Sequence, residues 1–195
     1  MSATVPISPL PFVATESRRF GRRTSLPAKT SCLWRIERGV VRTISWLEDA
    51  TTVTLGLWGP GDVIGKPLSK IDPYQFECIT EVEAIVLPRE HWSQLTEALI
   101  LYAQRLEELS IIRSHKRVEE ALIHLLNWLG QRFGQEVVQG HLLDLRLTHQ
   151  DLADLLGTTR VTITRILNQL EQQGTIRRLS RQQILLQGEC WHYEI

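Results

Sequence analysis

The sequence predicts an α+β chain with three parts: an N-terminal β-roll (jelly-roll), a long dimerisation helix and a C-terminal winged helix-turn-helix. Three observations predict this architecture. Short β-like runs separated by glycine- and proline-containing turns fill the first half of the chain. Apolar residues then recur at helical spacing from about residue 89. Finally, two short helical patterns joined at Gly157 are followed by two alternating runs.

The predicted β-roll covers residues 21–88 and follows an N-terminal tail, residues 1–20, which contains Pro6, Pro9 and Pro11 and shows no apolar periodicity. Polar or glycine-rich turns separate its short apolar runs at regular intervals. Many short strands of this kind are typical of a jelly-roll or a β-barrel. The expected strands lie at residues 33–36, 40–46, 51–58, 63–65, 75–80 and 84–87.

A long helix is predicted over residues 89–114, and the C-terminal domain is predicted over residues 115–195, beginning with a helix at 118–133. In the long helix, apolar residues recur at spacings of 4, 3, 4 and 3, as in the seam of a coiled coil. This stripe predicts a dimer interface; the alternative, which two heptads leave open, is that it packs only on the chain's own β-roll. Its members are Leu95, Leu99, Tyr102, Leu106 and Leu109.

Two short helices joined at a glycine form the predicted helix-turn-helix. Thr148 is a good N-cap, and Asp151 can return a hydrogen bond to it while favouring the positive end of the helix dipole. Gly157 can adopt the left-handed conformation that ends the first helix, and Thr158 or Thr159 can cap the second. The expected buried residues are Leu152, Leu155 and Leu156 in the first helix and Ile163, Ile166, Leu167 and Leu170 in the second.

Four residues remain on the outward face of the second helix near its N-terminus: Arg160, Val161, Thr164 and Arg165. In a helix-turn-helix, these positions meet base edges in the major groove of DNA. The arginine fork matches the O6 and N7 atoms of guanine, whereas Val161 can only touch a thymine methyl group. We therefore expect these four residues to read bases. The alternative is an ordinary pair of amphipathic helices with solvated arginines.

A basic β-hairpin is predicted directly after the second helix. Two alternating runs around a polar turn follow Gly174 and predict a wing. Between residues 157 and 187, five arginines accompany one acidic residue, Glu171. Such a local basic patch is expected of a surface that contacts phosphates. The residues expected to contact the DNA backbone are Thr148, Thr159, Arg177, Arg178 and Arg181.

The order of these elements and the string from Gly157 to Arg165 resemble the C-terminal domain of the Crp/Fnr superfamily of bacterial transcription regulators. The recognition helix is most similar to that of the nitrogen-control branch in cyanobacteria. The run from Gly59 to Gly65 resembles the cyclic-nucleotide-binding-like sensor roll of the same superfamily, so the likeness covers roughly residues 30–187. It implies a homodimer that regulates transcription from a palindromic operator with half-sites of the GTA type. RNA polymerase is an implied partner if the protein is an activator.

The expected effector pocket departs from that of the cAMP receptor protein. That protein carries a Gly-Glu pair where this chain has Gly65 and Lys66, and an Arg-Ser pair near the position of Asp72. A carboxylate there would repel a cyclic phosphate, so we expect no dependence on cAMP or cGMP. Gly65 and Lys66 mark the expected pocket for another, unknown effector. The alternative is that Lys66 is an ordinary surface charge.

Composition indicates a globular regulator rather than an enzyme. The 22 basic and 22 acidic residues balance, but the acidic middle of the chain, residues 43–112, separates two more basic parts. No nucleophile elbow, phosphate-binding loop or catalytic triad is present, and no cofactor is expected. No membrane span or signal peptide is expected, so the predicted location is the cytoplasm. The rival function is a ligand-binding sensor module that signals through protein–protein contacts.

Metal sites are not expected. The cysteines Cys32, Cys78 and Cys190 lie far apart, and an iron–sulfur cluster of the Fnr type needs four cysteine ligands. They are therefore interpreted as reduced thiols. The six histidines show no spacing typical of a zinc site. A haem bound by a single histidine stays open, because one residue is enough to hold it.

Overall fold

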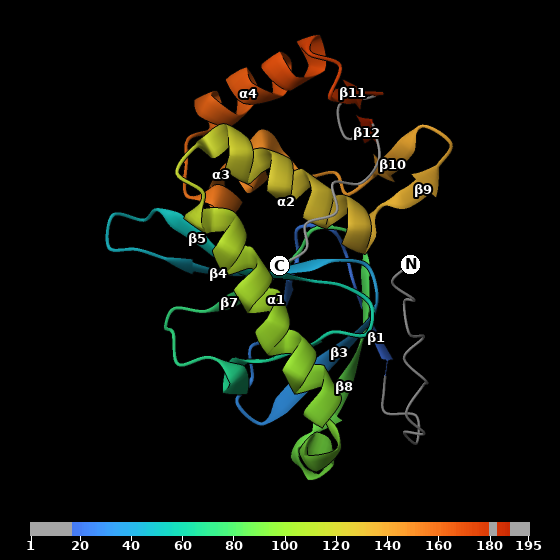
Figure 1. Ribbon diagram of the computed structural model, residues 1–195. Helices are drawn as coiled ribbons and strands as arrows, with labels where there is room; N and C mark the ends of the chain where they lie inside the picture. The colour runs from blue at the N-terminus through green and yellow to red at the C-terminus, as the bar shows by residue number, and fades with distance from the viewer. Residues whose placement is uncertain (1–16, 180–182, 188–195) are drawn as a thin grey trace.

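The computed structural model describes residues 17–179 and 183–187. Figure 1 shows a β-roll, a long helix that crosses it, and a C-terminal domain at one end of the roll. The two four-stranded sheets of the roll have the orders β1-β8-β3-β6 and β2-β7-β4-β5. Their strands are β1 Ser17–Phe20, β2 Ser25–Leu26, β3 Cys32–Arg38, β4 Val41–Trp46, β5 Thr52–Trp58, β6 Val63–Ile64, β7 Gln75–Cys78 and β8 Val82–Pro88.

Large aromatic side chains fill the interior of the roll. Trp34, Trp58 and Phe76 are almost fully buried between the two sheets. Trp58 stacks on Tyr102 of the long helix, with ring centroids 4.4 Å apart, and Tyr74 meets Phe76 edge to face at 5.1 Å. The roll and the helix therefore share one core, to which each buried aromatic side chain contributes a large apolar area.

The roll begins four residues earlier than predicted. Strand β1 lies at Ser17–Phe20, within the predicted tail of residues 1–20, and pairs antiparallel with β8 from Ser17↔Ile85 to Phe20↔Val82. Three of its four residues are exposed, so backbone hydrogen bonds rather than an apolar face hold the strand. A strand of this kind has no hydrophobic alternation to predict it. The rest of the predicted tail, residues 1–16, lies outside the described residues.

The predicted helix at residues 89–114 is divided in two. A 3-10 helix, η2, spans Arg89–Gln94, and the α-helix α1 spans Thr96–Ser114. The apolar stripe predicted for a dimer interface packs mainly on the chain's own roll. Leu95 and Leu109 are each only 1% exposed, while Tyr102 and Leu106 pack against the core of the roll. Leu95 and Leu109 are thus covered within one chain, Tyr102 and Leu106 are half-buried, and Leu99 is exposed.

The C-terminal domain combines three helices with a four-stranded sheet of order β11-β12-β10-β9. The first helix has the predicted bounds, and the hairpin β9–β10, which the sequence did not predict, joins the wing strands through the β10–β12 pair. The elements are α2 Val118–Phe133, β9 Gln135–Val137, β10 Gly140–Leu143, α3 His149–Leu156, α4 Arg160–Gln172, β11 Ile176–Arg178 and β12 Ile184–Gln187.

The two domains share a continuous hydrophobic core. The cluster that contains the buried faces of α2, α3 and α4 also includes Val40, Leu57 and Ile79 from the roll. Arg132 of α2 donates to the Leu57 carbonyl and to Asp62, the latter at 2.6 Å. The C-terminal domain is therefore seated on the roll by both apolar and polar contacts. No helix in the described part of the chain is long and apolar enough to cross a membrane.

Candidate nucleic-acid interface

The helix-turn-helix forms as its capping residues predict. The Thr148 hydroxyl accepts a hydrogen bond from the Asp151 amide at 3.1 Å, and the Asp151 carboxylate accepts one from the Thr148 amide at 2.8 Å. This is a complete capping box at the start of α3. Gly157 ends the helix with φ 64° and ψ 38°, the left-handed conformation that glycine adopts without strain. Thr159, rather than Thr158, caps α4 by accepting from the Thr162 amide.

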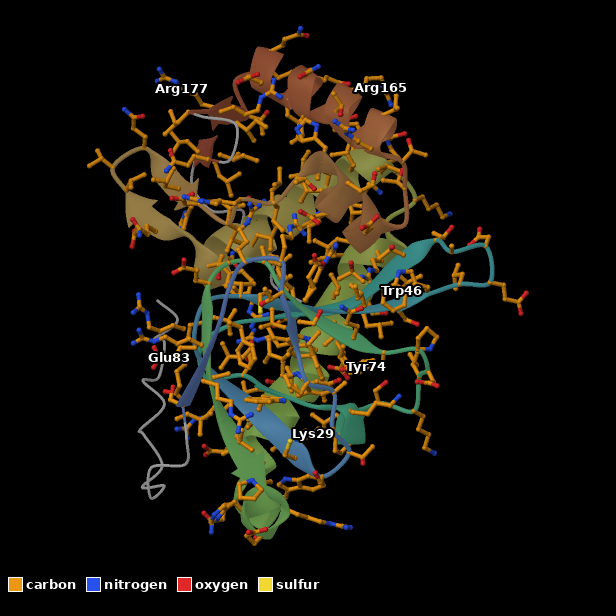
Figure 2. All side chains as sticks on the ribbon, turned by 180° about the vertical axis from the view of Figure 1, so that it is seen from behind. Lys29, Trp46, Tyr74, Glu83, Arg165 and Arg177 are labelled. Carbon is orange, nitrogen blue, oxygen red and sulfur yellow. The ribbon has the colours of Figure 1, made fainter. Side chains whose placement is uncertain are left out.

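The outward face of α4 presents unengaged arginines to solvent. The four residues predicted to be buried, Ile163, Ile166, Leu167 and Leu170, are all buried. Arg160 and Arg165 are exposed, and Val161 is 78% exposed. Within the described part of the chain, neither arginine forms a hydrogen bond or an ion pair through its side chain. Figure 2 shows Arg165 of α4 and Arg177 of β11 at the same end of the molecule.

Thr164 differs from its neighbours on this face because its hydroxyl is already engaged. It donates to the Arg160 carbonyl at 2.9 Å and lies 2.8 Å from Nδ1 of His149, the first residue of α3. Sequence reasoning missed His149, since it assessed the histidines only as metal ligands. The available signal was position, because His149 directly follows the N-cap of a helix that leads into a predicted recognition helix.

The two adjacent wing arginines have different environments. Arg177 is exposed and, among the described residues, forms no hydrogen bond or ion pair through its side chain. Arg178 donates to the Glu171 carboxylate through Nε at 2.9 Å and through Nη2, and also donates to Asn168 Oδ1 at 2.8 Å. The Arg178 guanidinium is thus largely neutralised by its own chain. Arg181, the third predicted wing contact, lies outside the described residues.

A buried ion network joins the first helix of the motif to the roll. The Asp151 carboxylate, 3% exposed, binds the Arg23 guanidinium through two hydrogen bonds of 3.0 and 2.6 Å. Arg42 of β4 lies 3.1 Å from the same carboxylate and 3.3 Å from Asp154. Glu77 of β7 completes the network by pairing with both arginines. The charges of α3 that face the roll are therefore matched by arginines of the roll.

These contacts set the ionisation of Asp151. Burial opposes the charged form, but the hydrogen bonds from Arg23 and Thr148 and the charge of Arg42 outweigh it. The pKa of Asp151 therefore lies below its usual value. The same pairing raises the pKa of the Arg23 guanidinium. Both groups are charged across the physiological range, and each depends on the other for compensation.

The tentative effector positions are engaged within the chain. A Cβ atom at Gly65 would overlap the Leu33 side chain, so the backbone of β6 packs closely against β3 there. The Lys66 ammonium donates to the Ile71 carbonyl and lies 3.4 Å from Asp72. A cavity of about 810 Å³ lies elsewhere, beside the domain junction, and its lining includes Arg22, Arg38 and Arg146. Gly65 and Lys66 do not line that cavity.

The described cysteines and histidines form no cluster that could hold a metal ion. Cys32 and Cys78 are buried free thiols, and burial raises the pKa of Cys78 to about 11. A thiol with a raised pKa is protonated at neutral pH and is a weak nucleophile. Cys190 lies outside the described residues.

Comparison with known proteins agrees with this geometry. Residues 116–188 match the model of the Crp-like helix-turn-helix domain. The regulatory protein CysR of Synechococcus elongatus is 41% identical over 181 residues, which cover 91% of this chain and 85% of CysR. The global nitrogen regulator of a Nostoc species is 36% identical over 63 residues, 32% of this chain and 28% of that regulator.

A solved structure shows the same fold. A CRP-family transcriptional regulator from Thermus thermophilus has a TM-score of 0.75 and 22% sequence identity, covering 88% of this chain and 92% of its own. The sequence relatives and the domain match are DNA-binding regulators, a group that is not enzymatic. The chain therefore belongs to the Crp/Fnr family of DNA-binding transcription regulators.

Proposed function

We propose that this chain acts as a homodimer that binds a palindromic operator, with α4 of each protomer in the major groove. One observation carries the proposal: Arg160 and Arg165 project from the exposed N-terminal face of a capped helix, and no side chain or carbonyl of the described residues engages them. Free guanidinium forks at this position can each bind a guanine through O6 and N7. Recognition helices of a two-fold dimer then meet half-sites about one DNA turn apart.

The remaining exposed residues refine this assignment. Val161 offers only an apolar contact, which suits a thymine methyl group, and Thr164 shapes the readout beside it. The resemblance of α4 to the nitrogen-control branch favours a half-site of the GTA type. The hydroxyls of Thr148 and Thr159 are occupied by capping, so any contact that these residues make with phosphates must be shared with their caps.

The two wing arginines should differ in how they contribute to DNA affinity. Arg177→Ala is expected to lower affinity for any DNA sequence and to reduce the slope of log K against log salt concentration by about 0.9 for each lost phosphate contact. Arg178→Ala should change this slope less, because Glu171 already compensates the Arg178 charge. Fluorescence anisotropy at several salt concentrations measures both slopes. A larger effect at Arg178 than at Arg177 would contradict the assignment.

The exposed face of α1 is the proposed dimer interface, in place of the buried stripe. Ile100 and Ile111 are 53% and 47% exposed, although both are large apolar residues. They continue a line of exposed positions spaced three or four residues apart, which is the seam pattern of paired helices. Small residues on this line would let two helices approach closely. The exposed positions of the line are Ile100, Ala103, Glu107, Ile111 and Ser114, and the exposed Leu99 and Ser110 lie beside it.

Replacing Ile100 with lysine should weaken the dimer at least tenfold. In a parallel two-fold pair of helices each lysine would face its own copy, and like charges placed together at an interface are strongly unfavourable. Sedimentation equilibrium measures the dissociation constant. Leu47→Lys is the matched control, because Leu47 is an equally exposed apolar residue on the roll, 58% accessible and outside α1. A dimer weakened equally by both variants would contradict the interface.

Selection of bound sequences from a random DNA pool tests the proposed function directly. Enrichment of a palindrome with two separated half-sites supports it. Absence of any enriched sequence at low salt supports the rival function, a sensor module that signals through protein contacts. Repeating the selection with cell-extract metabolites shows whether an effector is needed. A chain that binds chromosomal DNA acts in the cytoplasm of a bacterium, and an activator of this kind would also contact RNA polymerase.

A further inference from the structure

The contact between His149 and Thr164 determines how the imidazole ring must be protonated. The Thr164 hydroxyl has one proton, which it donates to the Arg160 carbonyl at 2.9 Å. Toward Nδ1 of His149, 2.8 Å away, the same oxygen can therefore only accept. Nδ1 must then carry a hydrogen. A neutral ring with its proton on Nδ1 has an unprotonated Nε2, which can accept but cannot donate a hydrogen bond.

The position of His149 makes Nε2 relevant to DNA. The residue begins α3, directly after the N-cap Thr148, and its ring lies against the outward face of α4, between the two helices of the motif. The first helix of a helix-turn-helix crosses the DNA backbone when the second helix enters the groove. A phosphate oxygen at this point would need a donor. As long as the Thr164 hydroxyl donates to the Arg160 carbonyl and holds the hydrogen on Nδ1, the imidazole offers a donor at Nε2 only in its cationic form.

The charged groups that face the ring favour its neutral form in the free protein. Burial is the largest influence, and the charges of Arg178 on β11 and Arg160 on α4 act in the same direction. The pKa of His149 is therefore lowered from its ordinary value. Glu171 pairs with Arg178 rather than with the histidine, and the Asp151 carboxylate on α3 binds Arg23 of the roll. Because Glu171 already pairs with Arg178, a DNA phosphate would supply a counter-charge for Arg160 and for a protonated His149.

We propose that His149 is a phosphate-binding residue that also positions Thr164 on α4, and that operator binding takes up a proton at its Nε2. The inference rests on the proposed function, since it requires DNA on this face. The positioning role follows from the two hydrogen bonds of Thr164, which fix its hydroxyl between His149 and Arg160. The proton uptake follows because a nearby phosphate stabilises the cationic ring.

Proton uptake makes operator affinity depend on pH with a definite sign. His149 has a higher pKa in the complex than in the free protein. At every pH between these two values, the complex binds more protons than the free protein. Affinity must therefore rise as pH falls through that window. One proton per protomer corresponds to at most about a tenfold gain per pH unit, or about a hundredfold for a dimer that takes up two.

Anisotropy titrations with the selected operator, at constant ionic strength from roughly pH 5.5 to 8.5, test the proposal. The wild-type protein is expected to bind more tightly as the pH falls. His149→Gln should show a flat profile, because glutamine can donate to Thr164 but does not titrate. His124→Gln is the control: His124 lies on α2, stacked on His115 with ring centroids 4.3 Å apart. This variant should keep the wild-type slope.

A flat wild-type profile overturns the proposal, as does a His149→Gln slope equal to that of the wild type. Nuclear magnetic resonance of the ring nitrogens provides a second test that needs no variant. It should show the Nδ1-protonated form in the free protein and a higher pKa in the complex. Any other free tautomer, or an unchanged pKa, also overturns the proposal. Failure to bind any sequence even at the low end of the pH range would instead count against the proposed function itself.

Discussion

Replacing Asp151 with alanine is expected to lower the free energy of unfolding by about 3–5 kcal/mol, the usual loss when one partner of a buried ion pair is removed. Arg23 and Arg42 would lose the carboxylate that compensates them, and the Thr148 amide and hydroxyl would lose their acceptor. Since domains of this kind are stable by roughly 5–15 kcal/mol, the loss would be a large part of the total. Urea denaturation measures it.

Two further variants make this result specific. Glu136→Ala removes an exposed carboxylate from β9 and should change the stability by less than about 0.5 kcal/mol. Asp151→Asn keeps the shape of the side chain and removes only its charge. It should retain part of the capping while leaving Arg23 with Glu77 alone and Arg42 with Glu77 and Asp154. A loss at Asp151→Ala no larger than at Glu136→Ala would show that the network contributes nothing.

The pH dependence of this contribution has a clear sign. Asp151 has a lower pKa in the folded protein than in the unfolded chain, so its contribution is fully present above the unfolded value of about 3.9. It is lost as the pH falls through the folded pKa. The contribution of Asp151 to the free energy of unfolding is thus constant above roughly pH 5. It can be told apart from a change in stability caused by histidine titration near neutral pH.

Because the ion network around Asp151 joins α3 to the roll, the helix-turn-helix is held in a fixed orientation relative to the roll. Arg113 of α1 donates to the Leu155 carbonyl of α3 at 2.6 Å and also to the Thr54 carbonyl of β5. Arg22 links the Ile79 carbonyl of the roll to the Arg146 carbonyl just before α3. The helix-turn-helix is consequently oriented by the roll, and a change at this end of the roll would be transmitted to α4 through α3.

The parts of the fold that were predicted correctly depend on local chemistry. Thr148, Asp151 and Gly157 lie within ten residues of one another, and the caps that they form require no distant partner. The bounds of α2 follow from its own periodicity and from Gly134. Local signals of this kind are read directly from a sequence, since propensity, capping and pattern all favour the same structure.

The parts that were missed depend on distant partners. The apolar stripe of α1 was identified, but periodicity shows which residues share a face and not which surface covers that face; here it is the roll. Asp151 was predicted only as a cap, because its ion pair with Arg23 joins residues 128 positions apart. Strand β1 was missed for a related reason, since its partner β8 is more than sixty residues away.

In the candidate site too, some residues could be placed from local sequence, whereas others depend on partners that are distant in the sequence. Arg160 and Arg165 could be placed on an outward face from helical spacing alone, and they are exposed. Arg177 and Arg178 are neighbours of the same type, and only the folded wing shows that one is exposed while Glu171 holds the other. The link between His149 and Thr164 needs the angle at which α3 and α4 cross, which no local pattern specifies.

Replacing Arg160 with alanine should weaken binding to the selected operator by about 1–3 kcal/mol per half-site, which corresponds to about 5- to 150-fold. Arg160 forms no side-chain hydrogen bond or ion pair within the described chain, so its removal leaves no buried group unsatisfied and should not affect stability. In a dimer the loss applies at both half-sites. Fluorescence anisotropy measures the affinity for the selected operator and for a shuffled sequence at one salt concentration. The comparison separates contacts to bases from contacts to phosphates.

The expected signature is a loss confined to the operator, together with a relaxed preference at the one base pair that Arg160 reads. Arg177→Ala is the matched control, since it removes a wing arginine that also forms no side-chain hydrogen bond or ion pair with the described residues, and it should weaken binding to both DNAs alike. If Arg160→Ala instead lowers affinity equally for operator and shuffled DNA, its guanidinium contacts phosphate and not a base. Base recognition by α4 would then depend on Arg165, Thr164 and Val161 alone, too few polar groups for a long half-site.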